Sequence, residues 1–444
     1  MRRKLFNTVI TVTVLTVLLL LYGLSFYLNT PRYWESVVLT TLVYAVFAVA
    51  VVLFIPHLTS LLAGDEQQHL IRQGDRTFRR CGTRELAKLI LAIMAFRLIE
   101  ILLTYLIHYA HFGYERTFLE VQRVWLDFYH VETAFPLYGY LSQVFWIFTF
   151  NFNHARFIGS FVFTAFAGAA LYALVLFDFN RKNARRAVRF LYLLPISCLL
   201  LGTVPDGLFL LLSILALYFM RKRLFAIANA FAMLAVTTHA IGLLLFFPIL
   251  AEYIAYLIAN SRSNREMGKR YLVKQVLNSL SFVLIPIGFV LVLLYASLRF
   301  GDAFVLYRSA FGSFQITMPG ALFEYFDSVV ESTKTILPDT IPMLCVTVLP
   351  QILYLFGVCV LIMLGSGRID TSYVLLMVLI VPLVLMTGRI DSAAAWITIL
   401  APVYIAIAAS VQKRWTNYLL LILFGGSWIL YFYAFIIGFT GASV

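Results

Sequence analysis

The sequence predicts an all-α, polytopic transmembrane protein with about thirteen spans. Apolar and aromatic residues make up 62% of the 444 residues and charged residues only 12%, whereas soluble proteins carry about 25% charged residues. The apolar residues recur in long runs, which is typical of segments that face lipid. The net charge of +13 arises from Lys and Arg between these runs, a pattern that favours the positive-inside rule over nucleic-acid binding.

Residues 1–57 contain the first two predicted spans. The basic stretch Met1–Lys4 precedes an apolar run from about Val9 to Leu28, which is too long for a signal peptide and lacks a small-residue cleavage site. A second run extends from about Ser36 to Ile55. Residues 58–88 are rich in arginine, and we expect them in the cytoplasm against anionic headgroups. The N-terminus is therefore predicted to be cytoplasmic.

Residues 89–298 form the predicted core, with an outer loop at 111–135. Its spans run from about Leu89 to His108, from Phe157 to Leu176, in two short pieces on either side of Thr203–Gly207, in two on either side of Thr237–His239, and from Leu277 to Leu298. The fourth span ends at a basic run that begins with Arg181 and belongs in the cytoplasm under the positive-inside rule.

The polar segment 299–341 is long for a connector and is predicted to lie outside. Two helical pieces are expected in it, near Phe304–Phe311 and Ala321–Ile336. In the second piece three acids share one helical face, namely Glu324, Asp327 and Glu331. Such a face can line an acceptor groove, but it is more typical of a solvated surface. Residues 342–444 then hold four spans and place the C-terminus outside; for a bacterial chain the expected location is the plasma membrane.

The outer loop concentrates side chains that suit sugar and phosphate chemistry. It carries Glu120 and Asp127, whose carboxylates can deprotonate a sugar hydroxyl, and Arg123, which can pair with a lipid-linked phosphate. Trp125 adds a ring that can stack on a sugar, and His130 a group that can hold the carrier phosphate. The same composition is also typical of an amphipathic helix with aromatic residues at headgroup level.

Two charges lie inside the third span. Arg97 and Glu100 are three residues apart, so they share a helical face and are expected to pair. Elsewhere the sequence offers no zinc-like or disulfide-like cysteine spacing and no Gly-rich phosphate loop. No metal and no cofactor are predicted.

A family resemblance covers roughly Phe96 to Glu252. Four stretches carry it by their order and spacing, namely Phe135-Pro136-Leu137-Tyr138, Leu194-Pro195-Ile196-Ser197, Asp206-Gly207-Leu208-Phe209-Leu210-Leu211-Leu212-Ser213 and Thr238-His239-Ala240-Ile241-Gly242. Together they resemble the PIG-V-type mannosyltransferases, which belong to the multispanning GT-C glycosyltransferases. The chain departs from the family pattern where Trp125-Leu126-Asp127 replaces a Trp-Asp pair, where Asp206 replaces Glu, and where His239 replaces Arg.

The resemblance implies transfer of a mannose-like sugar from a polyprenyl-phosphate carrier at the outer or luminal membrane face, with inversion and with lipid phosphate as the leaving group. Asp127, or else Glu120, would be the catalytic base. Six further residues would bind substrate or carrier, namely Arg123, Trp125, His130, Asp206, His239 and Arg389. Expected partners are a polyprenyl-phosphate-linked sugar, a glycan or glycolipid acceptor, the bilayer and a small membrane subunit.

Several residues also have simpler interpretations. Asp206 after Pro205 is typical of a helix N-cap, His239 of a cap at a helix end, and Arg389 of a turn with a local ion pair.

Two other functions stay open. A catalytically silent GT-C-like scaffold would explain the altered Trp-Asp pair. A transporter or flippase of lipid-linked saccharides would require more polar groups deep in the spans than the sequence offers.

Overall fold

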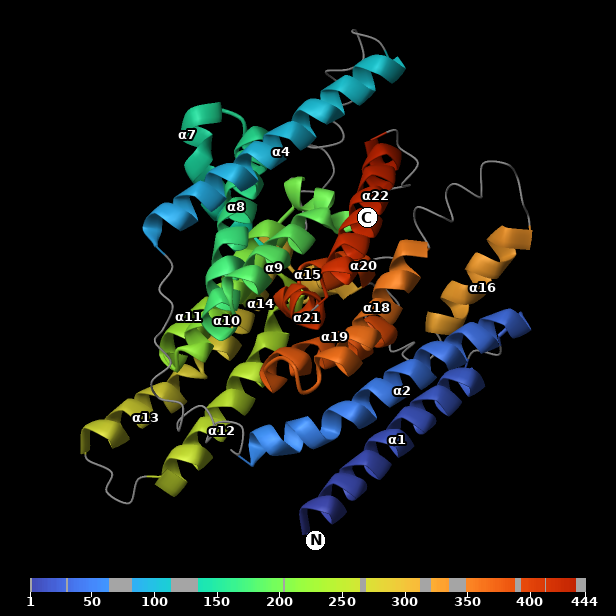
Figure 1. Ribbon diagram of the computed structural model, residues 1–444, viewed down its shortest axis with the longest axis vertical. Helices are drawn as coiled ribbons and strands as arrows, with labels where there is room; N and C mark the ends of the chain where they lie inside the picture. Colours follow the sequence, from blue (N-terminus) through green and yellow to red (C-terminus); the bar gives the residue numbers. More distant parts are fainter. Residues whose placement is uncertain are drawn as a thin grey trace. The chain divides into compact units, whose positions relative to one another are not determined.

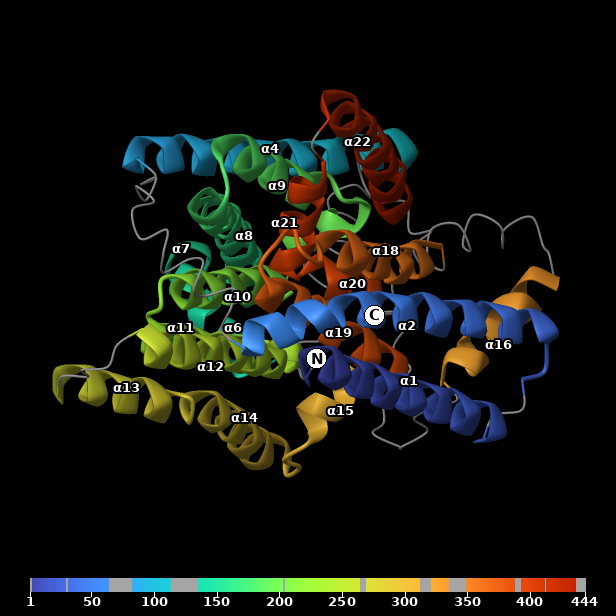
Figure 2. The same cartoon turned by 60° about the horizontal axis from the view of Figure 1, so that its bottom comes forward.

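The structure is a computed structural model, shown in Figures 1 and 2. It describes residues 2–28, 31–63, 82–112, 135–202, 204–263, 269–311, 321–334, 349–387, 393–411 and 413–436. Every regular element in these ranges is a helix, which confirms the all-α prediction.

Seven helices in the described ranges are long and apolar enough to cross a membrane, or eight if the bent pair formed by η3 (Pro195–Leu201) and α10 (Asp206–Arg221) counts as one span. The bent pair covers two of the spans expected from the sequence. Four further apolar helices are shorter, with 10–17 residues. The chain therefore has the helices of a multispanning membrane protein, and several of them are too short to cross a bilayer alone.

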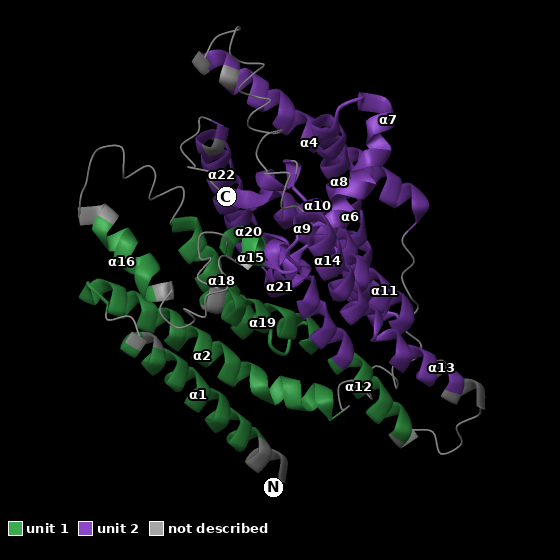
Figure 3. Cartoon of the chain, turned by 180° about the vertical axis from the view of Figure 1, so that it is seen from behind, with its two compact units in different colours: residues 1–74, 251–265, 308–397 green, residues 75–250, 266–307, 398–444 purple. Residues whose placement is uncertain are grey.

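The chain forms two compact units, coloured separately in Figure 3. Unit 1 comprises residues 1–74, 251–265 and 308–397, and unit 2 comprises residues 75–250, 266–307 and 398–444. The helices of unit 1 are α1 (Arg2–Leu28), α2 (Trp34–Leu62), α16 (Ala321–Lys334), α18 (Leu349–Gly365), α19 (Thr371–Thr387), most of α20 (Ala393–Thr398) and the C-terminal part of α12 (Phe246–Ser263).

Unit 2 contains the predicted core. Its elements are α4 (Thr83–Phe112), α6 (Pro136–Ser142), η2 (Gln143–Phe145), α7 (Trp146–Thr149), α8 (Phe152–Asp178), α9 (Arg181–Leu193), η3 (Pro195–Leu201), α10 (Asp206–Arg221), α11 (Phe225–Val236), η4 (Ala240–Leu245), the start of α12, α13 (Lys269–Ser281), α14 (Leu284–Phe300), α21 (Ala401–Ser410) and α22 (Arg414–Ile436). The short helix α15 (Val305–Phe311) begins in unit 2 and ends in unit 1.

Helix α2 organises unit 1. It packs against α1, α16, α18 and α19, and it buries Val43, Phe47, Ala50 and Phe54 at the spacing of a single helical stripe. Helix α1 runs beside it in both views. Most of the described apolar side chains of α1 are exposed or half-buried, as expected of a helix that faces lipid.

Helix α16 confirms one of the two helical pieces expected in segment 299–341, and α15 confirms the other. The acidic face of α16 is not simply solvated. The carboxylate of Asp327 accepts the backbone N–H groups of Arg32 and Tyr33, at 2.9 and 3.3 Å, and Glu331 lies 3.4 Å from the Arg32 guanidinium. Because Tyr33 is the N-cap of α2 and makes no side-chain cap, Asp327 supplies the acceptor that the start of α2 needs.

Helix α8 organises unit 2 and packs against α4, α6, α9 and α10. Small residues on α8 and α10 allow this close approach. A Cβ atom on Gly168 would lie 2.7 Å from Ile93 Cδ1 on α4, and one on Gly207 would lie 2.6 Å from Thr164 Cγ2 on α8. At both positions an added methyl would force a neighbouring side chain to move, and small residues are common where membrane helices cross closely.

Helix α9 differs from the sequence prediction. The basic run that begins at Arg181 was expected to end a span, and the next span to follow it; instead these residues open α9. The apolar side chains Ala184, Ala187 and Val188 are buried, while Arg181 and Arg185 are exposed. Asn180 caps the helix by accepting the N–H of Asn183, and Pro195 then begins the 3₁₀ helix η3.

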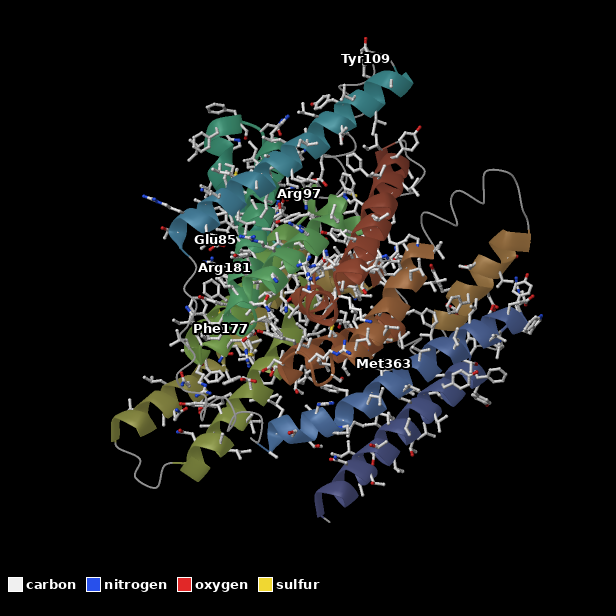
Figure 4. The ribbon with its side chains drawn as sticks, viewed as in Figure 1. Glu85, Arg97, Tyr109, Phe177, Arg181 and Met363 are labelled. Atoms are coloured by element: carbon white, nitrogen blue, oxygen red, sulfur yellow. The ribbon has the colours of Figure 1, made fainter. Side chains whose placement is uncertain are left out.

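The charges inside α4 pair as expected. Arg97 Nη1 lies 2.6 Å from Glu100 Oε2, and both side chains are fully buried. Arg97 Nη2 also donates to the carbonyl of Ser197 in η3 at 3.2 Å, and the guanidinium lies 4.8 Å from the centre of the Tyr192 ring on α9. The Tyr192 hydroxyl in turn donates to Thr164 O of α8 at 2.7 Å. Arg97, labelled in Figure 4, thus joins α4 to η3 and α9.

The acidic contact with α2 leads to a first prediction. Asp327→Asn should lower the free energy of unfolding by about 0.5–1 kcal/mol, because a neutral amide is a weaker acceptor at a helix N-terminus than a carboxylate. Glu331→Gln removes only an exposed ion pair and should cost less than about 0.5 kcal/mol. Thermal unfolding of the purified variants in detergent would compare them, and equal shifts would contradict the assignment of Asp327 as the acceptor.

The buried pair leads to a second prediction. Arg97→Met should cost about 3–5 kcal/mol, because it leaves the Glu100 carboxylate buried without its partner. The double variant Arg97→Met with Glu100→Leu removes both charges and should recover much of that loss. The measurement is the yield of monodisperse protein and its melting temperature. A double variant less stable than Arg97→Met alone would show that the pair is not a coupled unit.

Candidate functional site

Three of the motif stretches found in the sequence meet in unit 2. Tyr138 of α6 is buried, and its hydroxyl lies 2.7 Å from Ser160 Oγ on α8 and 2.9 Å from the carbonyl of Arg156. Ser160 Oγ donates to Val204 O, at 3.1 Å, just before α10. The N–H of Leu137 donates to Thr237 O at 3.2 Å. The stretches around residues 135–138, 204–206 and 237–239 are therefore held together by hydrogen bonds.

Asp206 is the first residue of α10. Pro205 occupies the N-cap position and makes no side-chain cap, so the alternative interpretation of Asp206 as the N-cap is wrong. The carboxylate instead lies in the first turn of a 16-residue helix, where the helix dipole favours a negative charge. It retains 19% exposure. Asp206 is thus available to groups outside the helix.

His239 is the N-cap of η4, as one of the two interpretations of the sequence expected. Its Nδ1 accepts the N–H of Ile241 at 3.3 Å, which assigns the proton to Nε2 in the neutral ring. Nε2 faces Asp206 Oδ1 at 3.9 Å, and the side chain is 13% exposed. This separation is too long for a direct hydrogen bond. A donor and an acceptor therefore face each other across a gap that is partly open.

Aromatic rings line the His239 side of this pair. Phe135 stacks on His239 with 6.5 Å between ring centres, and Phe209 lies 5.2 Å from it at a tilted angle. Tyr307 meets the edge of Phe135 at 5.4 Å, and Phe289 lies 5.0 Å from Tyr307. Burial raises the pKa of the Tyr307 hydroxyl, which stays protonated at neutral pH. Such a low-dielectric surround strengthens any charge interaction made by Asp206.

Gly242 fixes the position of His239. A Cβ at this position would lie 2.6 Å from the backbone N of Val236, and a backbone atom cannot move aside as a side chain can. Gly242 also donates its N–H to His239 O at 3.0 Å. Only glycine lets η4 fold back this closely onto the end of α11.

The arrangement offers one carboxylate and one imidazole N–H donor among aromatic rings. A carboxylate can accept a proton from a hydroxyl group, and an imidazole N–H can donate to a phosphate oxygen. Within the described part of the chain, no three His, Cys, Asp or Glu side chains gather closely enough to hold a metal ion.

The structure brings together two of the predicted site residues, Asp206 and His239. Six others lie outside the described residues, namely Glu120, Arg123, Trp125, Asp127, His130 and Arg389. Sequence reasoning missed Tyr307, which contacts Phe135, and Phe289, which contacts Tyr307. No sequence spacing could have found them, because they approach from another part of the chain. Phe209 lay within a quoted motif, but nothing in the motif gave it a role.

A buried carboxylate in unit 1 was also not foreseen. Glu252 on α12 is almost fully buried, and its Oε2 accepts the hydroxyl of Ser372 on α19 at 2.8 Å. Asp370 Oδ1 accepts the N–H of Ser372 at 2.9 Å, which orients the start of α19. The contact links two apolar helices through one polar pair.

Comparison of the chain with known protein families, with curated proteins and with solved structures finds no match.

The position of Gly242 leads to a third prediction. Gly242→Ala should destabilise the protein by about 1–3 kcal/mol, because the added methyl overpacks against the backbone of α11. Gly139→Ala is the matched control on α6, where an added Cβ meets nothing within 4 Å and the helix should gain stability by up to about 1 kcal/mol. Melting temperatures of both variants would test the difference. A Gly242→Ala protein as stable as the native chain would exclude the close contact.

Proposed function

We propose that the chain is a membrane glycosyltransferase that moves a mannose-like sugar from a polyprenyl-phosphate carrier to a glycan or glycolipid acceptor. The observation that carries the proposal is the meeting of Phe135–Tyr138, Asp206 and His239 in one site. These stretches are separated by about seventy and thirty residues in the chain, and all three belong to the family resemblance. Their convergence supports a shared function.

The two departures from the family pattern also support a common role. Asp206 stands where the family has Glu, His239 stands where it has Arg, and these two side chains face each other. Asp206 keeps the negative charge of Glu on a shorter side chain, and His239 keeps a hydrogen-bond donor on a smaller side chain than Arg. An acceptor therefore still faces a donor. We expect the His239 Nε2–H to bind a phosphate oxygen of the carrier, with Asp206 holding a hydroxyl of the bound sugar.

The proposed reaction places the base on the outer loop. Asp127, or else Glu120, accepts the proton of the acceptor hydroxyl, and the freed oxygen attacks the anomeric carbon. The bond from that carbon to the phosphate oxygen breaks, and polyprenyl phosphate leaves with inversion at the sugar. The loop that carries both acids ends at Phe135, whose ring stacks on His239. Chain connectivity therefore supports a site shared by the loop and the Asp206–His239 pair.

The proposal includes a GT-C architecture of about thirteen spans with the N-terminus in the cytoplasm and the C-terminus outside. Charge supports this orientation. Arg221 and Lys222 lie at the end of α10 opposite Asp206, and Arg181 and Lys182 begin α9 after α8 has run away from the site. Under the positive-inside rule these cations are expected in the cytoplasm, which supports a position of Asp206 and His239 near the outer or luminal face. For a bacterial chain, we expect the plasma membrane as the location. We also expect a small membrane subunit as a partner.

A catalytically silent scaffold is the second candidate. The altered Trp-Asp pair at Trp125-Leu126-Asp127 favours it, because the family's base is displaced by one residue. A transporter is less favoured, because the polar groups described inside the apolar helices already bind one another. Arg97 and Glu100 are locked to each other and to Ser197, which leaves them little freedom to pass a substrate along.

Sugar transfer tests the proposal and gives a fourth prediction. Purified chain should transfer radiolabelled mannose from polyprenyl-phosphate-mannose, and Asp127→Asn or Glu120→Gln should lower the rate about a hundred- to ten-thousand-fold, as loss of a general base does. Asp206→Asn and His239→Asn should lower it about ten- to a hundred-fold, as loss of a hydrogen bond to a charged group does.

The control is Arg368→Gln, which neutralises an exposed side chain of unit 1 and should leave transfer unchanged. His239→Asn keeps an oxygen that can accept the N–H of Ile241, so the cap is retained while the Nε2–H and the ring that contacts Phe135 and Phe209 are removed. Transfer that survives both outer-loop substitutions would remove the proposed base. No transfer by the native chain from several lipid-linked sugars would favour the scaffold.

A further inference from the structure

Helix α9 carries an exposed arginine stripe made of Arg181, Arg185 and Arg189, which follow one another at four-residue spacing on one side of the helix. The opposite side is buried against α8 and α21. The stripe is therefore held in place by the packing of the helix beneath it, and Lys182 adds a fourth exposed cation beside it.

Fewer carboxylates than cations lie near the arginine stripe. Glu85 on α4 lies 3.4 Å from Arg181 and 4.0 Å from Arg185, and its carboxylate also accepts the Tyr172 hydroxyl at 2.5 Å. Figure 4 shows Glu85 and Arg181 close to each other. Among the described residues no carboxylate lies within 4.0 Å of Lys182 or Arg189. Glu85 thus lies beside two of the four cations, and the repulsion among these cations favours binding of an anion.

A second basic segment joins the stripe at the start of α22. Arg186 donates to Val411 O and so fixes the end of α21 beside α9. Lys413 and Arg414 follow directly and are exposed, and Phe190 of α9 contacts Phe424 of α22 with 5.8 Å between ring centres. Cations from two distant parts of the sequence therefore border one surface of unit 2.

The surface lies where membrane-crossing helices begin and end. The apolar span of α22 starts at Arg414, that of α8 ends at Asp178, and that of α4 starts at Thr83. Trp415 is 74% exposed at the first turn of α22. An exposed Trp beside Lys and Arg at the start of a span is typical of the headgroup level of a bilayer. The anion available at this level is the phosphate of a lipid.

We infer that the arginine stripe and the start of α22 bind the headgroup of an anionic phospholipid. Arg185 and Arg189 present guanidinium groups that can hold phosphate oxygens in a forked geometry, and Lys413 and Arg414 add charge from the other side. Trp415 packs at the glycerol and carbonyl level of the same lipid. The site is at the opposite ends of α8 and α10 from Asp206 and His239, so it does not depend on the proposed enzymatic function.

Binding of pyrene-labelled phosphatidylglycerol to the full chain, purified in a neutral detergent, tests the inference and gives a fifth prediction. The native chain should bind it at least tenfold more tightly than labelled phosphatidylcholine. Arg185→Gln with Arg189→Gln should weaken phosphatidylglycerol binding about twenty- to thirty-fold, since each cation near an anionic lipid contributes roughly a factor of five. Arg185→Lys with Arg189→Lys should recover most of the affinity.

The matched control is Arg299→Gln with Arg368→Gln, which removes two exposed cations elsewhere and should change the affinity less than twofold. Size-exclusion profiles identical to that of the native chain would show that the variants fold. Equal weakening by both pairs would overturn the inference in favour of general attraction to a basic protein. Equal binding of the two lipids would also overturn it, and displacement of the labelled lipid by inorganic phosphate would assign the site to a free anion.

Discussion

The candidate site depends on hydrogen bonds made by two buried hydroxyl groups. Tyr138 and Ser160 lie 2.7 Å apart at the junction of α6, α8 and the turn before α10, and they donate hydrogen bonds to the carbonyl groups of Arg156 and Val204. In an apolar surround such bonds are costly to break, because no water replaces them. They place Phe135 on one side and Asp206 on the other, so the geometry around His239 follows from them.

Much of the helical pattern was predictable from hydropathy and spacing. The bounds of α8, α15 and α16 lie within a few residues of expectation, because their apolar or acidic periodicity is strong. Helix α9 was not predicted, since a hydropathy average over Arg181–Arg186 hides the buried stripe of Ala184 and Ala187 beneath the charges. The contact of Asp327 with the start of α2 joins residues almost 300 positions apart, and no local pattern encodes it.

The same division between local and distant information holds at the site. The Arg97–Glu100 pair followed from a spacing of three residues on one helix, whereas its bonds to Ser197 and Tyr192 required the fold. Asp206 and His239 came from the family resemblance, and only the structure shows that they face each other. Tyr307 contacts Phe135 from beyond α14, in a segment whose composition indicates a polar connector and not a source of aromatic packing.

The ion pair of α4 also bears on how the chain enters the membrane during synthesis. A lone arginine or glutamate in the middle of a span opposes insertion. Arg97 and Glu100 can neutralise each other as soon as α4 is helical, because their contact needs no other helix. Ser197 is made a hundred residues later, so the bond that docks α4 must form afterwards. The pair therefore first lowers the free-energy cost of inserting α4 into the membrane. Later, the hydrogen bond from Arg97 to Ser197 fixes α4 against η3.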